Sequence, residues 1–124
     1  MVIWITGKAS SGKTTYANRL KKLIEIKDNK VLVLDGDDVR QYFKSGFTDK
    51  DREEHILRIA AFAAVAEKQG FIVIIALISP KKEWRVKARK LFDESILVYT
   101  PGGYLWEGSI YEEPDYEEII STGK

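Results

Sequence analysis

Residues 7–14 combine glycines, a lysine and a threonine at a spacing that can hold a nucleoside triphosphate. Gly7 is followed, after four residues, by Gly12-Lys13-Thr14. Glycines let the backbone fold around an anion, so that successive N–H groups point inward at phosphate oxygens. Lys13 reaches the β and γ phosphates, and the Thr14 hydroxyl is placed to bind Mg²⁺. We therefore expect ATP and Mg²⁺ as cofactors, bound through Gly7, Lys8, Ala9, Ser10, Ser11, Gly12, Lys13, Thr14 and Thr15.

A second chemical signal is the pair of acids Asp35 and Asp37, which follow an apolar run. Beside a phosphate loop, one carboxylate can hold Mg²⁺ and the other can orient or deprotonate an attacking hydroxyl. We assign Asp35 to the metal together with Thr14, and Asp37 to catalysis together with Lys13, although the two aspartates could exchange roles. The alternative is that residues 35–37 have no chemical role and only form the turn that ends the strand and caps the next helix. The apolar run ending at Ile78 carries no terminal acid, which leaves Asp35 as the available metal support.

Apolar runs alternate with amphipathic stretches along the chain. The runs are short and several are rich in β-branched residues, and we expect buried strands at 2–6, 31–34, 71–78 and 96–99, with a short edge strand near 119–120. The stretches between them predict helices at 13–26, 38–43, 48–70 and 80–92. Strands that alternate with helices predict an α/β fold of the three-layer P-loop NTPase type, a mostly parallel sheet of about four to five strands with helices on both faces. Ligands gather at the carboxyl ends of such strands.

The composition limits the partners and surroundings. A chain of 124 residues is expected to form one domain over residues 1–124. Twenty basic residues nearly balance nineteen acidic ones, so any anion must be captured by a local site, and nucleic acid is disfavoured as a partner without being excluded. Without cysteine there are no disulfides. No apolar run approaches the ~20 residues of a membrane helix, and Met1 leads directly into a strand, so we expect a cytoplasmic protein and no membrane partner.

Four segments resemble, in the same order, motifs of adenylylsulfate (APS) kinases: 34–40 (LDGDDVR), 46–58 (GF, then DREEHILR), 76–80 (ALISP) and 111–114 (YEEP). The resemblance covers about residues 2–120. It implies a P-loop kinase that uses MgATP to phosphorylate the ribose 3′-hydroxyl of adenylylsulfate. It also implies that a small anionic, nucleotide-like substrate lies beside Asp37 and is lined by Arg40, Phe47, Arg52 and position 55, here His55.

Each of these acceptor-side candidates has a plainer interpretation. Guanidinium groups suit sulfate or phosphate, and Phe47 could stack on a base; otherwise the two arginines are solvated and Phe47 is a core residue. Ile78 and Ser79 in the ALISP segment, and Lys81 directly after it, are further candidates. Ser79 is more typical of a helix N-cap, with Pro80 as the first helical residue. Lys81 is more typical of an exposed basic face that continues over residues 82–90, and the acidic residues 112–118 are expected at the surface.

The sequence departs from the family pattern at three places. His55 stands where the family has asparagine, and it either contacts the acceptor or is an exposed helix residue. The phosphate loop carries Lys8 and its neighbours instead of the usual leucine, serine and glycine. We expect no counterpart of the family's long lid, since only residues 100–110 separate the fourth strand from Tyr111, and none of its C-terminal helix. Within them, Tyr104 and Trp106 either stack on a base or serve dimerisation or core packing.

The leading hypothesis is therefore an ATP-dependent small-molecule kinase that resembles adenylylsulfate kinase. A second hypothesis keeps the kinase and changes the acceptor to a nucleoside, a nucleotide or a hydroxymethylated base in nucleic acid. A third is a non-catalytic nucleotide-binding module. Because lids exclude water, the short form should either hydrolyse ATP or have its site covered by a second subunit, as in a homodimer.

Overall fold

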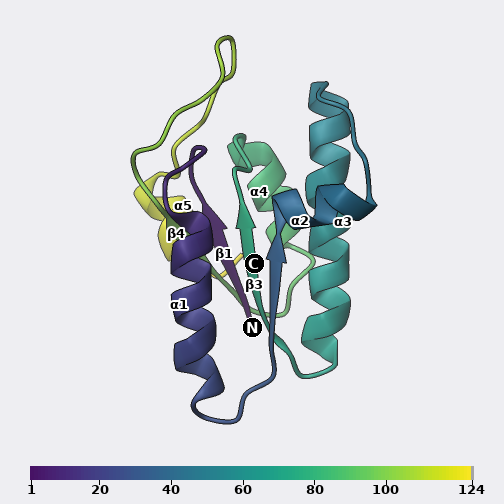
Figure 1. Cartoon of the computed structure of the whole chain (residues 1–124), viewed down its shortest axis with the longest axis vertical. Coiled ribbons are helices and arrows are strands. Elements are labelled where there is room, and N and C mark those ends of the chain that lie inside the picture. The colour runs from purple at the N-terminus through teal and green to yellow at the C-terminus, as the bar shows by residue number, and fades with distance from the viewer. Residues whose placement is uncertain (124) are drawn as a thin grey trace.

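The computed structural model describes residues 1–123 and shows a parallel sheet between helices (Figure 1). Within these residues the sheet has four strands: β1 (Val2–Thr6), β2 (Val31–Asp35), β3 (Ile72–Leu77) and β4 (Ser95–Tyr99). They lie in the order β2-β3-β1-β4, and all neighbouring strands are parallel. The predicted parallel sheet is confirmed, with the most apolar run, β3, at its centre. Lys124, which the predicted domain includes, lies outside the described residues.

Helices cover both faces of the sheet, as predicted. Helix α1 (Lys13–Glu25) packs on one face, where Ala17 lies among Ile5, Ile74 and Ala76. Helices α3 (Asp49–Lys68) and α4 (Lys82–Arg89) pack on the other face. That second core contains the fully buried Trp4 and the buried Trp84. Burial of each such large side chain stabilises the fold by about 1.5–3 kcal/mol, so the two cores hold the three layers together.

Side-chain caps begin the two helices that line the site. Helix α2 (Gly36–Tyr42) starts where the Asp35 carboxylate accepts a hydrogen bond from the Asp37 N–H. Helix α3 starts at Thr48, whose hydroxyl accepts from the Asp51 N–H at 3.1 Å, as the spacing of these residues predicts. Gly70, with φ of 91°, follows the C-cap of α3 in the left-handed conformation that glycine adopts most easily.

The structure corrects the predicted start of α4. This helix begins at Lys82 with Lys81 as its N-cap residue, so Ser79 is not an N-cap and Pro80 is not helical. Ser79 is instead buried in the turn after β3 with φ of 42°, and its hydroxyl bonds to side chains of β1. The predicted edge strand near 119–120 is also wrong, because these residues belong to helix α5 (Tyr116–Ile120), capped by Asp115.

Two surface predictions are wrong as well. Arg85 and Arg89 were expected on an exposed basic face, yet both are buried. Glu118 was expected in an exposed acidic stretch, yet it is buried and pairs with Arg85 at 2.7 Å. The reason is the docking of α5 beside α4, which covers this side of the helix and supplies the carboxylate that a buried guanidinium requires. No helix in residues 1–123 is long and apolar enough to cross a membrane.

Candidate active site

A cleft of about 1010 Å³ lies at the carboxyl ends of β1, β2 and β3. The topology brings together residues that are far apart in the sequence, because parallel strands end at the same edge of the sheet. Most of the predicted site residues line this one cleft: Ala9, Ser10, Gly12, Lys13, Thr14, Thr15, Asp35, Asp37, Arg40, Phe47, Arg52, His55, Ile78 and Ser79.

The remaining predicted residues do not line the cleft. Within the loop, Gly7 and Ser11 lie against Thr100, whose hydroxyl is 2.7 Å from the Ser11 hydroxyl. The carbonyl of Lys8 accepts a hydrogen bond from Lys13, and its ammonium group is not part of the lining. The Lys81 ammonium pairs with Asp49 at 3.0 Å instead of pointing at the cleft.

The loop between β1 and α1 has the backbone of an anion cradle. Gly12, with φ of 95°, and Ser10, with φ of 58°, adopt left-handed conformations that curl the chain around the N-terminus of α1. The Lys13 Nζ donates to the Lys8 carbonyl at 2.7 Å, which keeps the ammonium group at the mouth of the loop. Burial lowers the pKa of Lys13 from its ordinary value, and the charges of Asp35 and Asp37 oppose this shift.

The two aspartates lie beside this loop in different ways. The Thr14 hydroxyl donates to one oxygen of Asp35 at 2.8 Å, and the other oxygen caps α2. Asp35 therefore both caps the helix and faces the phosphate loop, so its interpretation as a helix cap is compatible with a role in metal binding. Hard oxygen donors of this kind suit Mg²⁺, and Thr14 and Asp35 fit it as a pair. Among residues 1–123 no cluster of three acids or histidines could hold a metal alone.

The far wall of the cleft is basic and aromatic. The Arg40 guanidinium stacks 5.2 Å from the centre of the Phe47 ring and donates to the Ser45 carbonyl at 3.2 Å. Phe47 is 74% exposed, which rules out the alternative that it is a core residue. Arg52, in the first turn of α3, lines the same wall.

His55 is buried, with only 3% of its surface exposed, so the alternative of an exposed helix residue is wrong. It lines the cleft, and neither ring nitrogen has a hydrogen-bond partner among residues 1–123. Burial lowers the pKa of His55, the charge of Arg40 lowers it further, and the Gly36 carbonyl opposes the shift. The imidazole is therefore neutral near pH 7, with one donor and one acceptor available.

The segment after β4 lies against the phosphate loop. Ala9 and Tyr104 form an antiparallel bridge, with main-chain N–H to carbonyl distances of 3.1 and 2.9 Å. Gly103 approaches the Ala9 carbonyl so closely that a Cβ would clash with it. Tyr104 and Trp106 are exposed, line the cleft and pack edge to face at 6.3 Å, which removes the core-packing alternative for both.

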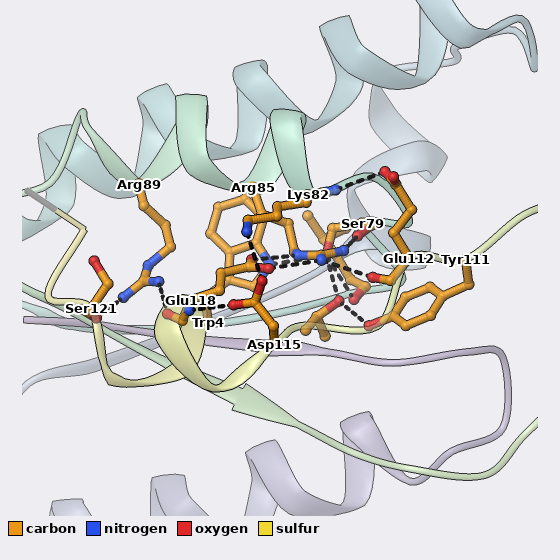
Figure 2. A network of polar contacts seen from close by, with 12 residues as sticks. Trp4, Ser79, Lys82, Arg85, Arg89, Tyr111, Glu112, Asp115, Glu118 and Ser121 are labelled. Atoms are coloured by element: carbon orange, nitrogen blue, oxygen red, sulfur yellow. Dashed lines mark hydrogen bonds and ion pairs between the residues drawn. The ribbon is translucent and has the colours of Figure 1, made fainter.

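Sequence reasoning missed a buried polar network behind this site (Figure 2). Arg85 on α4 donates to both oxygens of Glu118 and to the carbonyls of Ser79 and Glu112. Arg89 donates to the carbonyls of Glu118 and Ser121. One signal was present: Arg85 and Arg89 recur at the same four-residue spacing as the apolar Trp84 and Ala88, which places them beside the buried stripe of the helix.

A glycine-containing loop of this geometry, between the first strand of a parallel sheet and the helix that follows, defines a P-loop nucleotide-binding protein. The family model described as "Adenylylsulphate kinase" matches residues 1–102, and the chain belongs to that family.

Relatives of known name agree with this assignment. The adenylyl-sulfate kinase of Bacillus licheniformis is 45% identical over 95 residues, which are 75% of this chain and 48% of that protein. The Mycobacterium tuberculosis APS kinase solved with AMPPNP and APS has a TM-score of 0.76 and 31% identity over 81% of this chain and 61% of its own. A hexameric APS kinase from Thiobacillus denitrificans has a TM-score of 0.78 and 28% identity over 92% of this chain and 23% of its own. The chain thus spans about half the length of the Bacillus protein.

Proposed function

We propose that the protein transfers the γ-phosphoryl group of MgATP to the ribose 3′-hydroxyl of adenylylsulfate. The observation that carries the proposal is a cleft that the phosphate loop shares with the Asp37 carboxylate and the guanidinium groups of Arg40 and Arg52. Membership of the family supports it, as does the M. tuberculosis structure, whose ligands are an ATP analogue and APS.

The donor's phosphates fit the loop between β1 and α1. The N–H groups at the start of α1 and the Lys13 ammonium would hold the β and γ phosphates, and Thr14 with Asp35 would hold Mg²⁺, which spreads the charge of the transferring group. A second hollow of about 470 Å³ lies on the β4 side of the loop, lined in part by Thr15, Arg19 and Tyr99. We place the donor nucleoside there, because the acceptor groups occupy the opposite side.

The acceptor fits the basic and aromatic wall. Phe47 offers an exposed ring to the adenine base, and Arg40 and Arg52 offer forked donors to the phosphosulfate. Asp37 accepts the proton of the 3′-hydroxyl, whose oxygen forms a bond to the γ-phosphorus. The bond between that phosphorus and the β-γ bridging oxygen breaks, and ADP leaves with the electron pair. The work of the protein is to align the two substrates and to stabilise the charge on the moving phosphoryl group.

The test is release of ADP with and without adenylylsulfate, in a coupled assay with purified protein and MgATP. We expect adenylylsulfate to stimulate ADP release, and Asp37→Asn to remove the stimulation. Asp38→Asn is the matched control, because Asp38 is exposed and does not line the cleft. Equal ADP release with and without adenylylsulfate would refute the proposal.

A further inference from the structure

Three hydroxyl groups meet behind the cleft, where β1 and β3 end. The Thr6 Oγ1 lies 2.8 Å from the Tyr111 hydroxyl and 2.9 Å from the Ser79 hydroxyl. Thr6 also donates to the carbonyl of Ile78 at 2.7 Å, and the Trp4 indole donates to Ser79 at 3.0 Å. Thr6 and Ser79 are buried, and none of Trp4, Thr6 and Tyr111 lines the cleft.

The direction of the hydrogen bonds at Thr6 follows from the number of hydrogens and lone pairs on its hydroxyl group. Thr6 has one hydroxyl hydrogen, which the Ile78 carbonyl takes at the shortest distance in the cluster. Its two lone pairs then accept from Ser79 and from Tyr111, so Tyr111 is the donor of its bond. Burial raises the pKa of Tyr111 to about 12, so this phenol keeps its proton over the whole working pH range. The Thr6 hydroxyl then donates one hydrogen bond and accepts two, and the Ser79 hydroxyl also lies 3.4 Å from the Leu77 carbonyl.

This cluster joins the two halves of the site. On the donor side, Thr6 precedes Gly7, and its carbonyl accepts from the Thr100 N–H at 2.9 Å. The Thr100 hydroxyl in turn meets the Ser11 hydroxyl of the phosphate loop at 2.7 Å. On the acceptor side, Ile78 and Ser79 line the cleft.

Tyr111 is itself held from outside the cleft. Its ring lies 5.7 Å from the Arg85 guanidinium, which donates to the carbonyls of the neighbouring Glu112 and of Ser79. The Glu112 N–H also donates to the Pro80 carbonyl at 2.7 Å. Ser79 has φ of 42°, an uncommon conformation for serine that the surrounding bonds maintain. These contacts fix the segment that carries Tyr111 to the turn after β3.

We propose that Tyr111 is a positioning residue, which acts through Thr6 and Ser79 to fix the spacing between the phosphate loop and the acceptor edge of the cleft. The inference rests on the proposed phosphoryl transfer. In-line transfer needs the acceptor oxygen and the γ-phosphorus aligned at about 3–3.5 Å, and a misplacement of about 1 Å can cost 10²-fold in rate. Loss of the phenol hydroxyl leaves one lone pair of the buried Thr6 unfilled and loosens this spacing, while both binding surfaces stay intact.

The first test is steady-state kinetics of Tyr111→Phe, which keeps the ring and removes the hydroxyl. We expect kcat to fall roughly tenfold while the KM values for MgATP and adenylylsulfate stay within about twofold, since alignment is lost and binding is kept. Tyr116→Phe is the matched control on an exposed tyrosine, and it should match wild type. Thr6→Val should reproduce the defect and Thr6→Ser should retain most of the rate.

The kinetic outcomes separate the inference from the proposed function. If the wild-type protein turns over and kcat is unchanged in Tyr111→Phe and Thr6→Val, the inference about Tyr111 is overturned and the proposed function stands. A purely structural role also overturns it, and this would appear as a lower Tm with wild-type kcat at a temperature where the variant is folded.

A second test does not depend on the acceptor. Binding of MgATP should slow amide hydrogen exchange in a peptide spanning residues 77–84 of the wild-type protein, because the cluster ties the turn after β3 to the loaded phosphate loop. The protection should be lost in Tyr111→Phe at saturating MgATP. If wild type shows no protection there, or if the variant keeps it, the coupling does not exist. This result stands even if adenylylsulfate proves not to be the acceptor.

Discussion

Replacement of Glu118 by glutamine should be among the most destabilising single-atom changes in this protein. The Glu118 and Arg85 side chains are 2% and 0% exposed, and they are joined by bonds of 2.7 and 3.0 Å. The amide keeps one acceptor but turns an NH₂ group toward the guanidinium, so the Arg85 charge stays buried without a compensating negative charge. Breaking a buried pair in this way costs about 3–5 kcal/mol.

This cost is large against the stability of a domain of this size, which is roughly 6–18 kcal/mol at about 0.05–0.15 kcal/mol per residue. It corresponds to a fall in Tm of about 10–20 °C. Urea unfolding followed by circular dichroism measures the free energy directly. Glu53→Gln is the matched control, because Glu53 pairs with the exposed Lys87 at 3.1 Å and such surface pairs contribute about 0–1 kcal/mol. Equal losses for Glu118→Gln and Glu53→Gln would refute the reasoning.

Four further predictions concern the cleft. Lys13→Ala should weaken MgATP binding at least tenfold in calorimetry, because a charged hydrogen bond contributes about 1.5–3 kcal/mol; an unchanged Kd contradicts the assignment of the loop. Asp37→Asn should lower kcat by about 10²–10⁴ with little change in MgATP affinity, whereas a pure loss of affinity would mean that Asp35 and Asp37 have exchanged roles. Arg52→Ala should raise the KM for adenylylsulfate about tenfold or more; a loss of stability alone would give Arg52 a structural role. Because the pKa of His55 is lowered in the folded protein, the unfolded chain takes up its proton first as pH falls below about 6.5. The free energy of unfolding should therefore decrease with acidification more steeply in wild type than in His55→Asn. Equal slopes of the two proteins between pH 7 and 5 would contradict this.

The parts of the fold that depend on local patterns could be predicted from the sequence. Short apolar runs identified β1, β2, β3 and β4, and glycine spacing identified the loop before Lys13. The helix predicted over 48–70 corresponds to α3 with its N-cap residue Thr48 and the glycine that follows its C-cap. Because a parallel sheet brings strand ends together, the gathering of Asp35, Asp37 and Ile78 at one cleft could also be predicted.

The parts of the structure that depend on tertiary contacts could not be predicted from the sequence. Nothing local shows that Glu118 enters the interior, because its partner Arg85 lies 33 residues away. The start of α4 was misplaced for the same reason: the Ser79 hydroxyl is occupied by Thr6 and Trp4 from another strand and is not available to cap a helix. The bridge between Ala9 and Tyr104 likewise depends on main-chain hydrogen bonds, which the side chains of these two residues do not reveal.

We propose that a phosphoryl group is transferred to the 3′-hydroxyl of adenylylsulfate at the cleft between the phosphate loop and Phe47. Phosphorus NMR of the reaction mixture identifies the product directly. With MgATP and adenylylsulfate, the proposed transfer predicts a new phosphomonoester signal coupled to the ribose 3′ proton, formed in equal amount to ADP and absent with Asp37→Asn. ADP and inorganic phosphate appearing while adenylylsulfate stays unchanged would contradict it.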